Sequence, residues 1–317
     1  MTGIESSHET SEAYEPSDEF RARARVTSRE EYERLYRESL ESPEAFWKRE
    51  AADLTFRVPW TELVTWQPPF AKWFLGAKLN VSESCLDRHL GTPVADKPAI
   101  IWESEPGETR TLTYSQLHAK VLEFSAALRH LGVEKGDRVA IYMGMTPEAI
   151  IGMLACARIG APHSVVFGGF AAESLRDRIN DCGAKLVLTQ DGAWRKGSIV
   201  PLKATVDQAV SGAPSVEKVV VFRRVGEAAE AQMFEGRDID WNAAIEQARG
   251  LASDEAEVVE AEHPLFILYT SGSTGKPKGV LHTTAGYLVG AHVSTKYVFD
   301  LQPDDVYWCT ADIGWVT

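Results

Sequence analysis

The sequence has 317 residues, of which 44% are hydrophobic and 25% are charged, so its length suits about two domains of ordinary globular composition. Its formal net charge of −13 disfavours a nucleic-acid-binding surface, and its four scattered cysteines disfavour a disulfide framework or a zinc site. No apolar run is long enough to span a membrane and no signal-peptide pattern opens the chain, so we expect a cytoplasmic protein without a membrane partner.

The N-terminal region divides into a leader and an aromatic arm. Residues 1–27 begin with acids, serines and threonines, which predict a disordered leader. From Ser28 onward apolar side chains recur at helical spacing, and Pro43 opens a second helix. Four tryptophans follow without regular periodicity, at Trp47, Trp60, Trp66 and Trp73. We expect residues 28–92 to form an irregular arm that packs over the rest of the chain, the alternative being a small core of its own.

The remaining residues, 93–317, alternate apolar runs with amphipathic segments. The pattern predicts strands at 99–102, 111–114, 138–142, 161–166 and 185–189, with helices at 115–131, 147–159 and 171–180. Successive units of this kind predict an α/β fold, a parallel sheet covered by helices on both faces. We further expect an acidic surface excursion at residues 226–262, a helix at 283–297 and a strand at 305–309.

A strand followed by a polar loop stands out at residues 265–280, with the sequence LFILYTSGSTGKPKGV. Its first five residues predict a buried strand. The next residues combine glycines, hydroxyls and a lysine, which can grip phosphate oxygens through main-chain N–H groups and positive charge. The spacing is not that of a P-loop, because two residues rather than four separate Gly272 from Gly275, and Pro277 follows the lysine. A mobile glycine-rich turn is the alternative.

Three segments carry a resemblance to a known family. Residues 265–280 resemble the [ST]SG[ST]TGxPKG signature of the adenylate-forming superfamily. Residues 73–90, WFLGAKLNVSESCLDRHL, are similar to the N-terminal segment of the acetyl-CoA synthetase family, and residues 311–317 match its ADxGWVT string. The resemblance implies part of the large N-terminal domain of an adenylate-forming enzyme, with residues 93–317 as an incomplete AMP-binding domain.

The resemblance also implies a reaction and its substrates. Acetate attacks the α-phosphate of ATP to give acetyl-AMP and pyrophosphate, and the thiol of CoA then displaces AMP. By the same resemblance Mg²⁺ takes part, but its ligands and the catalytic lysine of the family are expected outside this chain. We therefore expect little or no turnover from these residues alone. Two alternatives stay open, a propionyl-CoA synthetase or other short-chain ligase, and a non-catalytic CoA- or ATP-binding remnant.

The binding residues follow from the same motifs. The resemblance assigns the ATP phosphates to Thr270, Ser271, Gly272, Ser273, Thr274, Gly275 and Lys276. It assigns CoA to Phe167, Gly168, Gly169, Arg195, Lys196, Gly197, Ser198 and Thr317, and the acetate pocket to Trp315, Val316 and Thr317. Ser198 departs from the basic residue usual at its position, and Thr317 favours acetate over propionate. The oligomeric state is left open, although an unfinished sheet edge predicts poor solubility.

Overall fold

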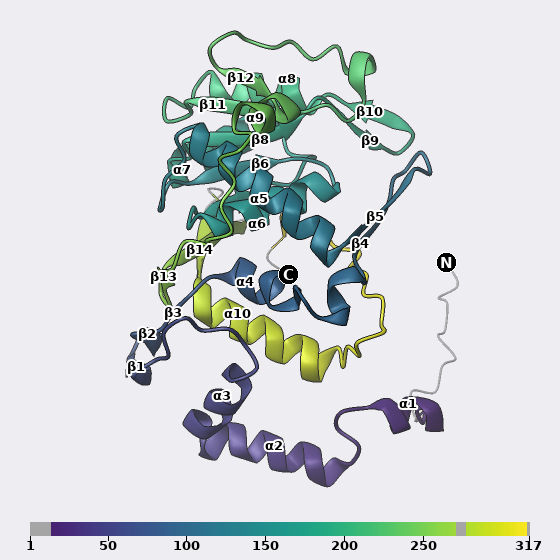
Figure 1. Ribbon diagram of the computed structural model, residues 1–317, viewed down its shortest axis with the longest axis vertical. Coiled ribbons are helices and arrows are strands. Elements are labelled where there is room, and N and C mark those ends of the chain that lie inside the picture. The colour runs from purple at the N-terminus through teal and green to yellow at the C-terminus, as the bar shows by residue number, and fades with distance from the viewer. Residues whose placement is uncertain (1–13, 271–276, 316–317) are drawn as a thin grey trace, which may run out of the picture.

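A seven-stranded mixed sheet forms the centre of the computed structural model, which describes residues 14–270 and 277–315 (Figure 1). Its strand order is β12 (Asp238–Asp240), β11 (Lys218–Phe222), β8 (Leu186–Gln190), β6 (Val139–Tyr142), β7 (His163–Val165), β14 (Pro264–Thr270) and β15 (Lys278–Thr283). Neighbouring strands are parallel except for the β14–β15 pair, which is antiparallel. The expected α/β fold is confirmed, with an antiparallel edge added to the parallel sheet.

Helices cover both faces of this sheet because its strands are apolar on both sides. Ile141 and Leu188 belong to one core cluster, with α5 (Tyr114–His130), α6 (Pro147–Arg158) and α9 (Trp241–Gln247). Their neighbours Tyr142 and Val187 belong to the opposite cluster, with α7 (Ala172–Cys182) and α8 (Leu202–Val210). Successive side chains of a strand point to opposite faces, so the two cores lie on either side of one sheet.

Local sequence signals set the ends of these helices. Thr113 and Gln116 form a reciprocal capping box at the start of α5, so the N-cap lies two residues before the expected cap at Ser115. Pro147 occupies the first turn of α6, as expected, and α7 ends at Gly183 in the left-handed region, with φ of 61°.

The aromatic arm packs against a helix from the far end of the sequence. It contains α2 (Arg29–Glu41), α3 (Pro43–Ala51) and the hairpin of β1 (Glu62–Gln67) with β2 (Phe70–Leu75). Trp47 contacts Trp73 edge to face, and their cluster includes Leu288 and Val289 of α10 (Thr284–Val293). A strand pair, β3 (Lys78–Leu79) with β13 (Val259–Glu260), adds a second connection. The arm therefore shares its core with α10 instead of having a separate one.

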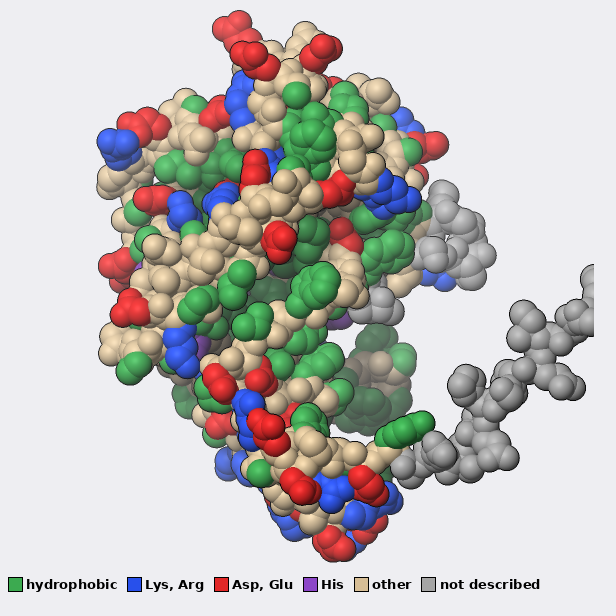
Figure 2. Space-filling model, turned by 90° about the vertical axis from the view of Figure 1, so that its right-hand side faces the viewer, with side chains coloured by type: hydrophobic (Ala, Val, Ile, Leu, Met, Phe, Trp, Pro, Cys, Tyr) green, Lys and Arg blue, Asp and Glu red, His purple; other side chains and the backbone are tan. Residues whose placement is uncertain are grey.

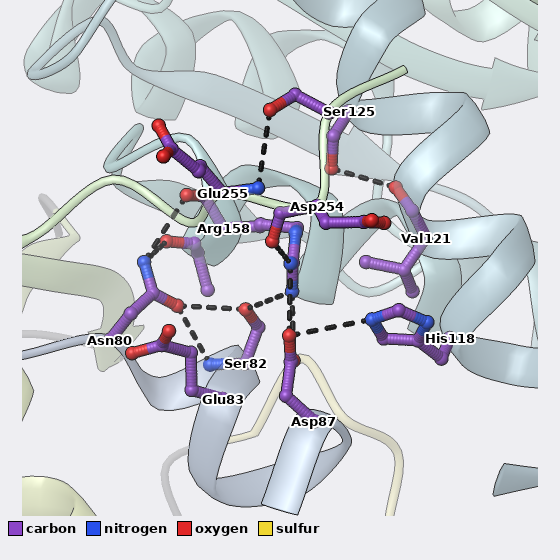
Figure 3. Close-up of polar contacts among 12 residues, drawn as sticks. Asn80, Ser82, Glu83, Asp87, His118, Val121, Ser125, Arg158, Asp254 and Glu255 are labelled. Atoms are coloured by element: carbon purple, nitrogen blue, oxygen red, sulfur yellow. Dashed lines mark hydrogen bonds and ion pairs between the residues drawn. The ribbon is translucent and has the colours of Figure 1, made fainter. Parts of the chain in front are cut away.

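A buried polar network joins the C-terminal part of the arm to the α/β body (Figure 3). Arg158 of α6 is 1% exposed and donates two hydrogen bonds to the carboxylate of Asp87, at 2.8 and 3.0 Å. Asp87 lies in η1 (Asp87–His89), directly after α4 (Val81–Cys85). Arg158 also donates to Ser82 Oγ at 3.2 Å, and Ser82 Oγ donates to Asn80 Oδ1 at 2.8 Å. One guanidinium thus fixes α4 and η1 against α6.

The remaining described elements are short. They are α1 (Asp18–Arg23), η2 (Pro93–Asp96), η3 (Gly226–Ala229), η4 (Ser294–Val298), the hairpin of β4 (Pro98–Glu103) with β5 (Thr109–Thr113), and the hairpin of β9 (Ala193–Arg195) with β10 (Ser198–Val200). Within the described ranges, none of the helices combines the length and the apolar character that crossing a membrane requires.

Three expectations need correction. Part of the expected leader is ordered, because residues 18–23 form α1 and Arg25 pairs with Asp300 at 3.0 Å. The acidic segment 226–262 is more than a surface excursion, since Trp241 stacks on Phe124 with ring centroids 3.5 Å apart. Residues 305–309 form no strand, because among the described residues they have no pairing partner and Trp308 is 82% exposed.

Candidate functional site

The predicted phosphate loop connects two paired strands. Thr270 ends β14 and pairs in register with Lys278, the first residue of β15, while Tyr269 pairs with Gly279. Residues Ser271, Gly272, Ser273, Thr274, Gly275 and Lys276 lie outside the described residues. Tyr269 anchors the strand end, because its hydroxyl donates to Asp181 Oδ2 at 2.7 Å. Burial and this hydrogen bond raise the pKa of Tyr269, so the phenol keeps its proton.

The turn at residues 167–169 follows β7 at the carboxyl end of the sheet. The hydroxyl of Tyr142, in strand β6, donates to the carbonyl oxygens of Gly168 and Phe170, at 3.2 and 2.7 Å, and so fixes the turn to the sheet. A Cβ at Gly169 would lie 2.2 Å from Nη1 of Arg195 and 2.5 Å from Cε1 of Phe167. A larger residue there would therefore displace the side chains of Arg195 and Phe167 from their present positions.

The hairpin of β9 and β10 carries the second predicted motif toward this turn. Arg195 lies over the ring of Phe167, with its guanidinium carbon 4.8 Å from the ring centroid. Lys196 and Gly197 form the two-residue turn with φ of 51° and 75°, as a type I′ turn requires. Glu105 of the neighbouring β4–β5 hairpin accepts hydrogen bonds from both of their backbone N–H groups. The structure therefore brings Phe167, Gly169 and Arg195 together.

A cavity of about 340 Å³ opens beside these residues. It lies where the parallel strands end, because Met143 follows β6, Phe167 follows β7 and Arg224 follows β11. Ligands in open α/β sheets bind at this edge, and the volume suits a small ligand or part of a larger one. Phe167, Gly168 and Arg195 line the cavity, whereas Gly169, Lys196, Gly197 and Ser198 do not.

Several residues of the cavity were not identified from the sequence. Trp102, Glu105 and Arg224 line it from segments that carry no recognisable motif. Only topology could have indicated Arg224, which lies two residues after the end of β11, a strand that was not predicted. In Figure 2, which turns the face of the two hairpins toward the viewer, Lys and Arg side chains lie interspersed with acidic and hydrophobic ones. A polyanion would therefore depend on a few local arginines.

Trp315 lies next to the turn at residues 167–169. Its ring centroid is 5.7 Å from that of Phe167 and 6.3 Å from that of Phe170. Asp312 also lines the cavity, and its carboxylate accepts the N–H of Gly314 at 2.8 Å. The expected acyl-pocket residue Trp315 and the expected CoA residue Phe167 are therefore direct neighbours. Val316 and Thr317 lie outside the described residues.

Among the described residues, no three His, Cys, Asp or Glu side chains are grouped so that they could hold a metal ion.

Comparisons with known proteins show the family of this chain. Residues 86–317 match the family of AMP-binding enzymes, and residues 32–85 match the acetyl-coenzyme A synthetase N-terminus. The chain is 50% identical to an acetyl-coenzyme A synthetase of Gemmatimonas aurantiaca, over 100% of this chain and 48% of that protein. It is 53% identical to the acetyl-coenzyme A synthetase of Rubrobacter xylanophilus, over 96% of this chain and 46% of that protein.

A solved structure extends the likeness to the fold. The acetoacetyl-CoA synthetase from Streptomyces lividans superposes with a TM-score of 0.84 at 28% identity, covering 95% of this chain and 47% of that one. The chain thus spans about half the length of the curated relatives and of the solved structure that it matches.

Proposed function

Because the chain belongs to the AMP-binding enzyme family, we propose that it is the N-terminal portion of an ATP-dependent acetate–CoA ligase. The complete enzyme forms acetyl-AMP and pyrophosphate from acetate and ATP, and then transfers the acetyl group to the sulfur of CoA, releasing AMP and a proton. The observation that carries the proposal is the convergence of Arg195 and Trp315 on Phe167, which lines the cavity together with Arg195. The proposal is also supported by two acetyl-coenzyme A synthetases whose sequences are 50% and 53% identical to this chain.

The described residues have separate roles in this proposal. Thr270 and the loop that follows it bind the ATP phosphates, which need N–H donors and cations around the reacting phosphorus. Phe167, Gly168 and Arg195 bind the nucleotide end of CoA, where the guanidinium pairs with phosphate. Trp315 provides the apolar wall of the acyl pocket, together with Val316 and Thr317. Mg²⁺ is expected to accompany ATP, with its ligands outside this chain.

The domain organisation is proposed on the same basis. Residues 1–27 precede an arm at 28–92, and residues 93–317 form the beginning of the AMP-binding domain. The packing of Trp73 against the apolar cluster that contains Leu288 supports a link between the arm and this domain. We propose cytoplasmic small-molecule chemistry, without a nucleic-acid partner.

CoA binding tests the proposal directly on this chain. We expect saturable CoA binding by calorimetry, and Arg195→Ala to weaken it about tenfold, because a charge-assisted hydrogen bond is worth about 1.5–3 kcal/mol. Arg249→Ala is the matched control, since Arg249 is exposed and pairs only with Glu246 in the described part of the chain. CoA binding that Arg195→Ala leaves unchanged would contradict the assignment.

The reaction itself is tested by acetate-dependent exchange of pyrophosphate into ATP. We expect this exchange from a protein that contains these 317 residues and is as long as the relatives. We expect far less exchange from the 317-residue chain alone. If the full-length protein prefers propionate, then propionate and not acetate is the substrate. CoA binding without any exchange at full length would instead favour a non-catalytic binding protein.

A further inference from the structure

The proposed CoA site contains one predicted cation at the cavity, and the ligand carries several phosphates. Arg195 lines the cavity, whereas Ser198 stands where a second basic residue was expected and does not line it. The nucleotide end of CoA bears a 3′-phosphate in addition to its pyrophosphate. One guanidinium is a small counter-charge for such a ligand in a protein with a net charge of −13.

A second guanidinium does line the cavity. Arg224 follows β11 and is 14% exposed at its side chain. Its backbone N–H donates to Asp191 Oδ1 at 2.8 Å, and the next two N–H groups also donate to this buried carboxylate. Asp191, which follows β8, thus fixes the backbone from which the Arg224 side chain projects.

Trp102 holds the other end of this side chain. The guanidinium carbon of Arg224 lies 5.2 Å from the centroid of the indole, and Arg110 lies 5.9 Å from the same ring. The indole is itself fixed, because its Nε1 donates to the carbonyl oxygen of Met145 at 2.7 Å. Arg224 therefore reaches the cavity in a position set before any ligand arrives, which limits the entropy lost on binding.

We propose that Arg224 is the second phosphate-binding cation of this cavity and that it recognises the 3′-phosphate of CoA. The inference rests on the proposed function. The present partner of Arg224 is Glu108, whose side chain is 57% exposed. An exposed ion pair is weak, so a phosphate dianion can replace it. The two arginines then contact the same ligand from different elements of the cavity lining, Arg195 from β9 and Arg224 from the segment after β11.

Calorimetric titration of the 317-residue chain with CoA and with 3′-dephospho-CoA tests this proposal. Arg224→Gln is expected to weaken CoA binding about tenfold and to change dephospho-CoA binding by less than about twofold. Arg223→Gln is the matched control, because it removes the same charge one residue away, where Arg223 pairs with Asp240 at 3.2 Å and does not line the cavity. The control is expected to bind both ligands like the wild type.

A second variant tests the same claim by a gain of affinity. Glu108→Gln releases Arg224 from its ion pair, so CoA binding is expected to strengthen about threefold, with dephospho-CoA unchanged. A merely structural role of Arg224 would not produce this gain. Because Glu108 is exposed, its replacement leaves the core intact.

The outcomes separate this inference from the proposed function. If wild-type chain binds CoA and Arg224→Gln binds it equally well, or loses affinity for both ligands alike, the inference is overturned and the proposed function stands. If Arg224→Gln weakens ATP binding but not CoA binding, the phosphate belongs to ATP and the inference is again overturned. If the wild-type chain binds no CoA, the proposed CoA site fails, and the inference fails with it.

Discussion

His163 is a buried histidine in the middle of the central sheet. It belongs to β7, is 5% exposed, and its Nδ1 has no hydrogen-bond partner among the described residues. Its ring lies 5.8 Å from that of Phe266 in the neighbouring strand β14. Burial lowers the pKa of His163 from 6.5 to about 4, so the folded protein holds this side chain neutral.

This pKa shift predicts a loss of stability in mild acid. Below pH 6.5 the unfolded chain binds a proton at His163 that the folded chain accepts only near pH 4, so stability falls between these values and then levels off. The whole effect is up to about 3 kcal/mol. His163→Leu is expected to flatten the pH dependence of the free energy of unfolding, measured with urea at pH 7.5 and 4.5. His130→Leu, at an exposed position, should leave it unchanged. An unaltered slope in His163→Leu would disprove the assignment.

Some residues in or beside the cavity were singled out from the sequence and others were not, for physical reasons. Phe167, Arg195 and Trp315 were found because they belong to strings of characteristic letters, and the structure makes them neighbours. Trp102, near the end of β4, and Arg224, after β11, were not predicted because no motif surrounds them, and only the fold brings them to one cavity.

At the scale of elements, the polar network around Arg158 connects pieces that are distant in sequence. Burial by itself raises the pKa of Asp87, but the hydrogen bonds and charge of Arg158 outweigh it and lower the pKa overall. The pair is thus ionised at neutral pH, with the guanidinium 1% exposed and the carboxylate 26% exposed. Loss of the carboxylate would leave a buried cation without its counter-ion.

Asp87→Asn is therefore expected to lower the free energy of unfolding by about 2–3 kcal/mol at pH 7. Asp137→Asn is the matched control, because its carboxylate is also 26% exposed and also accepts a 2.8 Å ion pair, but from Lys185, which is 26% exposed. Asp137→Asn should lower the free energy of unfolding by less than about 1 kcal/mol. Urea denaturation of both variants measures the difference, and equal losses would show that burial of Arg158 is unimportant.

Periodicity explains which elements could be predicted. The βα units from β6 to β8 were expected because apolar runs and amphipathic helices alternate there without interruption. The hairpin of β14 and β15 was not, because Gly279, His282 and Thr283 give β15 little strand character by themselves. Residues 305–309 show the opposite error, because Val306 and Trp308 alternate like a strand but have no described strand to pair with.

At the scale of the whole molecule, the central sheet ends at β15 in the strand order. In Figure 1, α10 and the arm lie on one side of this end, and the strands from β6 to β12 lie on the other. Val280 and Leu281 of β15 are 37% and 51% exposed. An edge strand with exposed apolar side chains can pair with another molecule, so the chain is expected to self-associate despite its net charge of −13.

A charge on this edge should suppress self-association. Leu281→Lys is expected to raise the monomer fraction in sedimentation velocity, because a lysine on an edge strand opposes pairing with a second strand. Leu40→Lys makes the same substitution in α2, where Leu40 is 63% exposed and away from the sheet edge, and should leave the monomer fraction unchanged. The control matters because every added lysine lowers the net negative charge, which by itself favours association. If both variants behave alike, net charge rather than the edge of β15 governs the assembly of this chain.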